Sequence, residues 1–378
     1  MKAKPAKTER SGTETLSQWQ LIRRRFKKHR LAVAAMFLLI VMYTLALFAE
    51  FFAPYPSMWK DLSYAYCPPT QIPRISLSDG LHVQAVKQHV DPITFQKTYM
   101  EDGKEVVPLG FFVKGEPYKL WGLIPWDRHF FGADLDATPQ SPVTKSPRFF
   151  LLGADKYGRD IFSRIVYGAR ISLSIGLLAI VITFVVGVTI GGISGYVGGA
   201  IDNFIQRCIE ILNAFPRLPL WLALGAAMPP AWSSLKVYFA ITIVLSMLGW
   251  TGLARVVRGK ILSLREEDYA TAAKLLGASH GRIIFRHLLP GFTSHIIVSL
   301  TLRVPTMILG ETSLSFLGLG LRPPIVSWGV MLQDCRTMQV VANYPWLLLP
   351  VIFIVITVLS FNFMGDGMRD AADPYSSR

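Results

Sequence analysis

Six long runs of apolar residues constrain the fold of this chain more than any other feature of its sequence. A helix needs about 20 consecutive, mainly apolar residues to cross a lipid bilayer, and residues 31–53 supply the first such run. Hydrophobic residues make up 51% of the 378 positions and are concentrated in these runs. The other five lie at about 171–193, 204–228, 237–253, 292–309 and 346–363. The sequence therefore predicts an all-α integral membrane protein with six transmembrane helices.

The third of these runs is the weakest candidate for a membrane crossing. Pro216, Arg217 and Pro219 interrupt it, and proline breaks the hydrogen-bond ladder of a helix. An interfacial helix over about 202–214 is therefore an open alternative.

The positive charges indicate how the helices are oriented. A basic block at 23–30 directly precedes the first run, and Lys and Arg are enriched in short cytoplasmic segments. This predicts that residues 1–30 are a basic cytoplasmic segment, without the cleavage site of a removed signal peptide. Six crossings also place the tail, 371–378, and the basic loop, 254–291, in the cytoplasm. Because most basic residues lie beside apolar runs, the net charge of +14 does not indicate nucleic-acid binding.

Residues 54–150 differ in character and are predicted to form an insert on the outer side of the membrane. Prolines, charged residues and aromatic residues are mixed there, and Asp102-Gly103 has the composition of a hairpin turn. We expect a small mixed or β-rich domain.

No metal site is expected, because no group of residues has metal-ligand spacing. The histidines of the insert are expected at the surface: His82, His89 and His129. Cys67 and Cys335 fall on the same predicted side of the membrane. A disulfide between them is an open alternative to two isolated thiols. Cys208 is interpreted as an isolated thiol as well.

The loop 254–291 contains the most informative motif, EEDYATAAKLLGASHGRIIFRHLLP at 266–290. Acidic residues at its start suit a helix N-terminus, and Gly277 stands where a helix end requires a left-handed residue. The predicted unit is a short helix, a glycine and a second helix, with a small-residue surface at Ala272 and Ala273 that lets another protein approach closely. An ordinary amphipathic connector between two spans would have the same periodicity.

This motif resembles the coupling loop of binding-protein-dependent ABC importer permeases, whose pattern is E-A-A, three residues, Gly, nine residues, Ile, one residue, Leu-Pro. The matching positions are Ala272, Ala273, Gly277, Leu289 and Pro290. Thr271 replaces the usual Glu, and His287 replaces the usual Ile. The resemblance implies that these positions, with Thr271, couple the loop to a groove on an ATPase.

Other segments are similar to dipeptide, oligopeptide and nickel permeases, and among these to the C-type subunit. They are LGADKYGRD at 152–160, SLSFLGLG at 313–320, SWG at 327–329 and GDGMRD at 365–370. The resemblance covers about 20–55 and 148–376 and leaves the insert unexplained. It implies the fold of a type I ABC importer permease, with a five-helix core at 151–370.

The same resemblance implies the partners and the setting. It predicts a homologous permease subunit, two ATPase subunits and an extracytoplasmic solute-binding protein in the bacterial inner membrane. The chain has no GxxxxGK[ST] phosphate loop, so neither an ATPase site nor a cofactor is expected in it, and ATP is bound by the partner ATPases. Peptides are the predicted substrates, while nickel chelates and oligosaccharides stay open.

Arg303 and Glu311 are the candidate pore residues. Arg303 lies thirteen residues beyond Pro290, about 20 Å along a helix, and a charge at that membrane depth is usually functional. Three interpretations stay open for Arg303: a pore-facing guanidinium that passes a substrate carboxylate, a packing partner of a carboxylate such as Glu311, and a side chain that snorkels towards the outer interface.

Two other classes of protein are alternatives to the importer subunit. A self-sufficient channel or secondary transporter would favour inverted repeats and broken helices in matching halves, and no convincing repeat is found. A membrane-embedded enzyme would need a catalytic motif such as HExxH or GxSxG, which the chain lacks.

Overall fold

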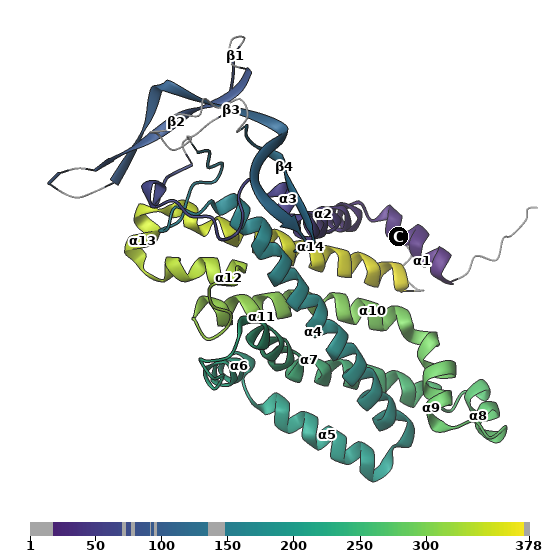
Figure 1. Ribbon diagram of the computed structural model, residues 1–378. Helices are drawn as coiled ribbons and strands as arrows, with labels where there is room; N and C mark the ends of the chain where they lie inside the picture. Colours follow the sequence, from purple (N-terminus) through teal and green to yellow (C-terminus); the bar gives the residue numbers. More distant parts are fainter. Residues whose placement is uncertain are drawn as a thin grey trace, which may run out of the picture.

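The computed structural model describes residues 18–69, 73–76, 80–90, 92–93, 97–134 and 148–373, without the side chains of 102–105. Most of the predicted N-terminal segment, residues 1–17, and most of the predicted tail, 374–378, lie outside this part of the chain. A helical bundle bears a four-stranded β-sheet at one end (Figure 1).

Within the described residues, five helical segments are long and apolar enough to cross a membrane. They are α2 (Arg30–Leu47), α4 (Ile161–Val197), α7 (Ser234–Leu264), the run from α9 to α11 (His280–Phe316) and the run ending in α14 (Pro345–Ala372). Most extend well beyond the predicted apolar run, because capping groups outside the run begin the helix. The Asp160 carboxylate, for example, accepts a hydrogen bond of 2.7 Å from the Ser163 amide, so α4 begins at Ile161.

α4 and α7 run parallel in close contact, because glycines on α4 leave no side chain between the two backbones. The contacts advance in the same direction along both helices, from Gly187 beside Leu253 through Gly191 beside Ala254 to Gly195 beside Arg258. A Cβ atom added at Gly191 would lie only 2.5 Å from the Ala254 carbonyl oxygen. Small residues permit this packing where lipid gives helices no hydrophobic drive to associate.

Gly191→Ala is expected to destabilise the bundle by about 1–3 kcal/mol, because the added methyl group would collide with the backbone of α7. Gly259→Ala is the matched control, since a Cβ there would meet nothing within 4 Å and alanine favours a helix. Thermal unfolding of both variants in one detergent should show a lower midpoint for Gly191→Ala alone. Equal midpoints would contradict the packing described above.

Two helices, α5 (Gly199–Ala214) and α6 (Arg217–Ala226), stand in place of the third predicted span. The backbone is extended at Phe215 and Pro216 between them, and each has fewer than 18 residues. Their contacts run backward along α7: Asp202 binds Arg258, Asn213 accepts a hydrogen bond from Thr251, and Trp221 meets Leu245 beside Gly310. The segment that connects the end of α4 to the start of α7 therefore runs back along the length of the bundle.

The run from α9 to α11 is also interrupted. It comprises α9 (His280–Arg282), a π-helical turn (Ile283–Leu288), a 3-10 turn (Leu289–Phe292), α10 (Thr293–Thr301) and α11 (Val304–Phe316). Pro290 and Pro305 lie in the first turns after two of the interruptions, where a missing N–H is tolerated. Arg303 therefore lies at a helix break.

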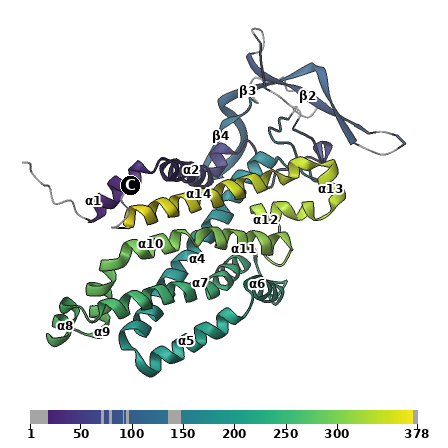
Figure 2. The ribbon, with the colours of Figure 1, turned by 180° about the vertical axis from the view of Figure 1, so that it is seen from behind.

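The bundle has two distinct ends (Figures 1 and 2). We call one the loop end: it contains α1 (Gln18–Lys28), α8 (Asp268–Leu275), α9 and the last turns of α14 (Leu349–Ala372). The other, the sheet end, contains the strands, α12 (Trp328–Met331), α13 (Met338–Asn343) and the 3-10 turns Leu332–Arg336 and Pro345–Leu348. Arg25 Nη1 of α1 donates to the Asp373 carbonyl oxygen at 2.6 Å. The two ends of the described chain therefore lie side by side at the loop end.

The strands form an antiparallel meander in the order β1-β2-β3-β4, within the segment for which β-structure is predicted. They are β1 (Arg74–Ser76), β2 (Gly80–Val90), β3 (Lys97–Leu120) and β4 (Ile124–Ala133), preceded by a 3-10 turn (Leu62–Tyr64). The prediction of a hairpin turn at Asp102-Gly103 is wrong. β3 continues through it, and the register against β2 shifts between Gln84 and Ala85, which absorbs the extra residues as a bulge.

His82 and His129 are buried, so the prediction that they lie at the surface is wrong for both. The ring nitrogens of His129 face two carbonyl oxygens, Nδ1 at 2.6 Å from Ala53 and Nε2 at 2.9 Å from Glu116. His129 thereby ties β3 and β4 to the end of α3 (Ala49–Phe52). The three cysteines are free thiols, so the disulfide alternative is not observed.

Candidate functional site

The loop between α7 and α10 folds into a short helical hairpin, and its turn is a complete helix C-cap. Gly277 has a φ of +79°, in the left-handed region that favours glycine. Its amide donates to the Lys274 carbonyl oxygen at 3.0 Å, and the Ala278 amide donates to that of Ala273 at 3.1 Å. This pair of bonds is the Schellman pattern. The prediction of a left-handed glycine that ends the first helix is confirmed.

The small-residue surface predicted at Ala272 and Ala273 is only partly present. Thr271 and Ala272 are exposed, but Ala273 is buried with Ala270 in the cluster that contains Ile283. Residues three apart share one face of a helix, so Ala270 and Ala273 turn inward together. The prediction is therefore wrong for Ala273, whose side chain packs inside the hairpin and does not lie on its surface.

Leu275 and Leu276, which the sequence reasoning did not single out, form the exposed tip of the hairpin. Their side chains are 84% and 88% exposed, and Tyr269 is exposed nearby on α8. Periodicity alone could not have singled them out, because the inward face of α8 is known only from the packing of Ala270 and Ala273; both leucines fall outside that face. A compact apolar patch of this kind is typical of a surface that binds another protein.

The hairpin is held by apolar packing that continues into the bundle. The buried residues are Ile283, Ile284 and Leu288 on the hairpin and Val257 and Ile261 on α7. A Cβ atom on Gly192 of α4 would lie 3.1 Å from Ile284. Leu289 is partly buried in the same cluster, and Pro290 is exposed where the next turn begins. The hairpin, α4 and α7 are therefore packed together through one apolar cluster.

An ion pair joins three helices beside the hairpin. Arg258 of α7 donates two hydrogen bonds of 2.6 Å, from Nε and Nη2, to the Asp202 carboxylate of α5. Ser194 of α4 donates to the same carboxylate, and Arg265 donates to the Gly195 carbonyl oxygen. Bidentate pairs of arginine and carboxylate are among the stronger polar contacts in proteins. The loop ends of α4, α5 and α7 thus form one unit.

Arg303 lies beside α7 and has no carboxylate partner among the described residues. Its Nη1 donates to the Gly249 carbonyl oxygen at 3.3 Å, and a Cβ atom on Gly252 would lie 2.6 Å from its Nη2. Arg217, at the break between α5 and α6, lies within electrostatic range of the same guanidinium. Two helix interruptions therefore bring two cationic side chains into one part of the bundle. Pairing of Arg303 with Glu311, one of the three interpretations, is wrong, because the Glu311 carboxylate binds serine hydroxyl groups instead.

Glu311 is fully buried in a ring of serine hydroxyl groups. Ser315 and Ser327 donate to its Oε1 at 2.8 and 2.7 Å, and Ser172 donates to its Oε2 at 3.2 Å. Ser172 also accepts the Trp328 amide at 3.1 Å. The carboxylate thus joins α4, α11 and the start of α12. Its prediction as a pore residue is not supported, because no part of it reaches a surface of the described chain.

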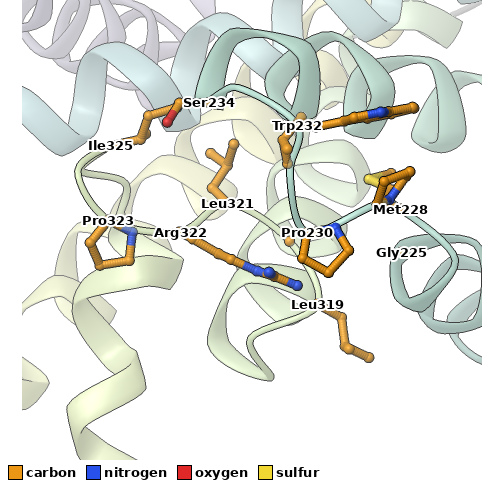
Figure 3. A pocket seen from close by; sticks show the side chains of 13 residues that line it. Gly225, Met228, Pro230, Trp232, Ser234, Leu319, Leu321, Arg322, Pro323 and Ile325 are labelled. Atoms are coloured by element: carbon orange, nitrogen blue, oxygen red, sulfur yellow. The ribbon is translucent and has the colours of Figure 1, made fainter.

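At the sheet end, a cavity of about 120 Å³ lies between the α6–α7 connection and the loop that precedes α12. Figure 3 shows Met228, Pro230 and Trp232 around it on the first segment, and Leu321 and Arg322 on the second. Arg322 is the charged residue of its lining. Prolines restrict the backbone of both segments, so this end of the bundle presents a recess with a restrained wall and one positive charge.

Two family models match this chain. Residues 187–377 match the family described as "Binding-protein-dependent transport system inner membrane component". Residues 17–69 match the "N-terminal TM domain of oligopeptide transport permease C".

Relatives of known name are similar to the chain over different lengths. The dipeptide transport system permease protein DppC of Bacillus subtilis (strain 168) is 43% identical over 222 residues, which cover 59% of this chain and 68% of that protein. The protein of the same name from Lactococcus lactis subsp. cremoris (strain MG1363) is 33% identical over 377 residues, which cover 98% of this chain and 94% of that one. The second alignment therefore includes the β-sheet insert.

Among solved structures, the chain is similar in fold to one chain of the MetNI methionine ABC transporter in an inward-facing conformation. That likeness has a TM-score of 0.44 and 16% sequence identity, over 56% of this chain and 96% of the other.

Proposed function

This chain belongs to the family of binding-protein-dependent transport system inner membrane components and is a permease subunit of a peptide importer, and we propose that separate ATPase subunits drive it through the α7–α10 hairpin. The observation that supports this most is the exposed Leu275-Leu276 tip on a hairpin whose other face is packed on α7. In this proposal the two leucines enter a groove on the ATPase, and Gly277 holds the shape of the turn. The permease itself is not an enzyme, and ATP is bound by its partners.

We further propose that the chain crosses the bacterial inner membrane six times with both termini in the cytoplasm. The third crossing is the broken pair α5 and α6, because the parallel helices α4 and α7 require a connection that returns over the length of the bundle. The loop end, with α1 and α8, then faces the cytoplasm, which agrees with the basic residues of α1. The sheet end faces outward, and the insert is extracytoplasmic.

The proposed assembly is the one that the family resemblance implies: this chain, a homologous permease, two ATPases and a solute-binding protein. The solute-binding protein would deliver peptide at the sheet end, where the cavity beside Arg322 opens between proline-rich segments. The hairpin at the opposite end leaves that surface free for it (Figure 1).

For the pore, we propose that Arg303 and Arg217 attract the carboxylate of a passing peptide. Both lie at helix breaks, and Arg303 has a buried Nε without a hydrogen-bond partner in the described structure. A cation at membrane depth that lacks a carboxylate partner is suited to meet a substrate anion.

Arg303→Gln is expected to reduce uptake of peptides with a free C-terminus by about 10–100-fold, the effect of losing a charged hydrogen bond worth about 1.5–3 kcal/mol. Uptake of the same peptides with an amidated C-terminus should change little. The control is Arg207→Gln, which removes an exposed arginine paired with Glu210 on α5. Equal losses for free and amidated peptides would contradict recognition of the carboxylate.

Purification of a tagged chain from its native membranes tests the proposed function. An importer subunit should copurify with ATP-hydrolysing subunits and a second permease, and the reconstituted complex should need ATP for uptake. A chain that purifies alone and transports peptide without ATP would instead be the alternative, a self-sufficient channel or secondary transporter.

A further inference from the structure

The turn between β3 and β4 touches the sheet end of the transmembrane helix α2. Trp121 and Gly122 adopt positive φ angles of 52° and 73° in this turn. The indole Nε1 of Trp121 donates to the carbonyl oxygen of Leu47, the last residue of α2, at 2.8 Å. The Trp121 ring also lies 5.5 Å from that of Phe48. The turn is therefore held at the depth where α2 ends, as Figure 1 also shows.

Aromatic side chains surround this turn and are largely open to the surroundings. We use the name aromatic patch for five of these residues: Phe51, Phe112, Trp121, Trp126 and Phe130. The Phe51 ring lies 5.9 to 6.0 Å from those of Phe112, Trp126 and Phe130. Phe112, Trp121 and Trp126 are exposed, and at the tip so are Leu123 and Ile124. The turn thus presents several exposed apolar side chains beside a membrane span.

One ion pair lies at this level, between Arg170 of α4 and Glu50 of α3. Arg170 donates to both oxygens of Glu50, at 2.7 and 2.6 Å, and to the carbonyl oxygens of Ala46 and Leu47 at 2.9 Å. Burial opposes ionisation of Glu50, but the hydrogen bonds from Arg170 prevail and lower the pKa of the carboxyl group. A paired charge costs less to place near lipid than a free one. The setting of the patch is therefore compatible with a membrane boundary.

We propose that the β3–β4 turn is a membrane anchor, with Leu123, Ile124 and the aromatic patch in the interfacial layer of the leaflet at the sheet end. The proposal rests on α2 as a membrane span. Its apolar side chains Phe37, Ile40 and Leu47 are exposed on the bundle and continue into the patch. Tryptophan is enriched at the boundary between lipid and water, where its ring is apolar and its N–H is satisfied. Here the Leu47 carbonyl oxygen satisfies the N–H.

The anchor would hold the sheet in a defined position. His129 already connects the hairpin to the end of α3. Contact with lipid at the tip adds a second attachment, so the sheet cannot rotate freely about α3. The insert would then keep one orientation toward whatever binds the sheet end.

A lipid-depth measurement with matched labelling positions tests the anchor. Cys208 and Cys335 are replaced by serine, and Cys67 is kept because burial, which raises the pKa of its thiol to about 12, makes it unreactive. Leu123→Cys places a fluorophore at the tip, and Ile75→Cys places one on β1, away from α2. The two residues are 80% and 86% exposed. The complete transporter is reconstituted in nanodiscs with lipids that bear a quencher near the headgroup.

We expect the Leu123 label to be quenched several-fold more strongly by the lipid quencher than the Ile75 label, and less by aqueous iodide. Ile124→Cys should repeat the result if Leu123→Cys folds poorly. Equal lipid quenching at Leu123 and Ile75 would overturn the proposal. So would a Leu123 label shielded from both quenchers, because the tip would then be covered by a partner subunit.

Discussion

Replacing Leu275 and Leu276 together with aspartate is expected to abolish ATP-driven peptide uptake while the permease stays folded in the membrane. Both side chains lie almost entirely outside the core, so the change removes no packing inside the chain. If they fill a groove on the ATPase, each acts as a binding hot spot worth about 2 kcal/mol or more. Losing both, and burying two carboxylates instead, would weaken ATPase binding by more than about 100-fold.

Met338→Asp is the matched control for this variant. Met338 lies on α13 at the sheet end and is 83% exposed, so the substitution has a similar chemical character far from the hairpin. The amount of copurified ATPase is measured for both variants, and uptake into proteoliposomes is measured for the double variant. If the double variant retains its ATPase and normal uptake, the hairpin tip is not the coupling surface.

Glu311→Ala is expected to be the most destabilising single change in the bundle, with a loss of about 3 kcal/mol or more. Three hydroxyl groups, on Ser172, Ser315 and Ser327, would each lose a buried acceptor, and each loss costs about 1–3 kcal/mol. The Trp328 amide, bound to Ser172, would also lose its ordered partner. The contacts among α4, α11 and α12 depend on this one carboxylate.

Glu311→Gln separates this structural role from a role in transport. The amide keeps the volume and one acceptor oxygen, so we expect a much smaller fall in the unfolding midpoint than with Glu311→Ala. Thermal unfolding of both variants in detergent is the measurement. An alanine variant that unfolds at the temperature of the unmodified protein would contradict the serine ring, and a stable glutamine variant that cannot transport would point to a direct role in the pore.

The local features of the fold could be predicted from the sequence because they depend on neighbouring residues. Apolar runs located the long helices, Pro216 and Pro219 marked the weak third span, and Gly277 gave the left-handed helix end. These signals require only hydropathy, the missing proline N–H and the backbone freedom of glycine.

The errors arose where tertiary contacts decide the outcome. Ala273 is inward because the hairpin packs on α7, which no spacing within the loop reveals. Glu311 meets serines from positions 139 residues before and 16 residues after it rather than Arg303 eight residues away. Asp102-Gly103 has turn composition, yet pairing with β2 and a bulge keep it inside a strand. In each case the partner is distant in sequence.

We propose that separate ATPases drive this permease through the Leu275-Leu276 tip of the hairpin, and site-specific crosslinking from Leu276 can show whether an ATPase lies against it. A photoreactive residue replaces Leu276 in the assembled transporter, with Met338 as the control position. We predict a crosslink from position 276 to an ATPase subunit and none from position 338. A stable, transport-competent complex with no ATPase crosslink at position 276 would contradict the claim.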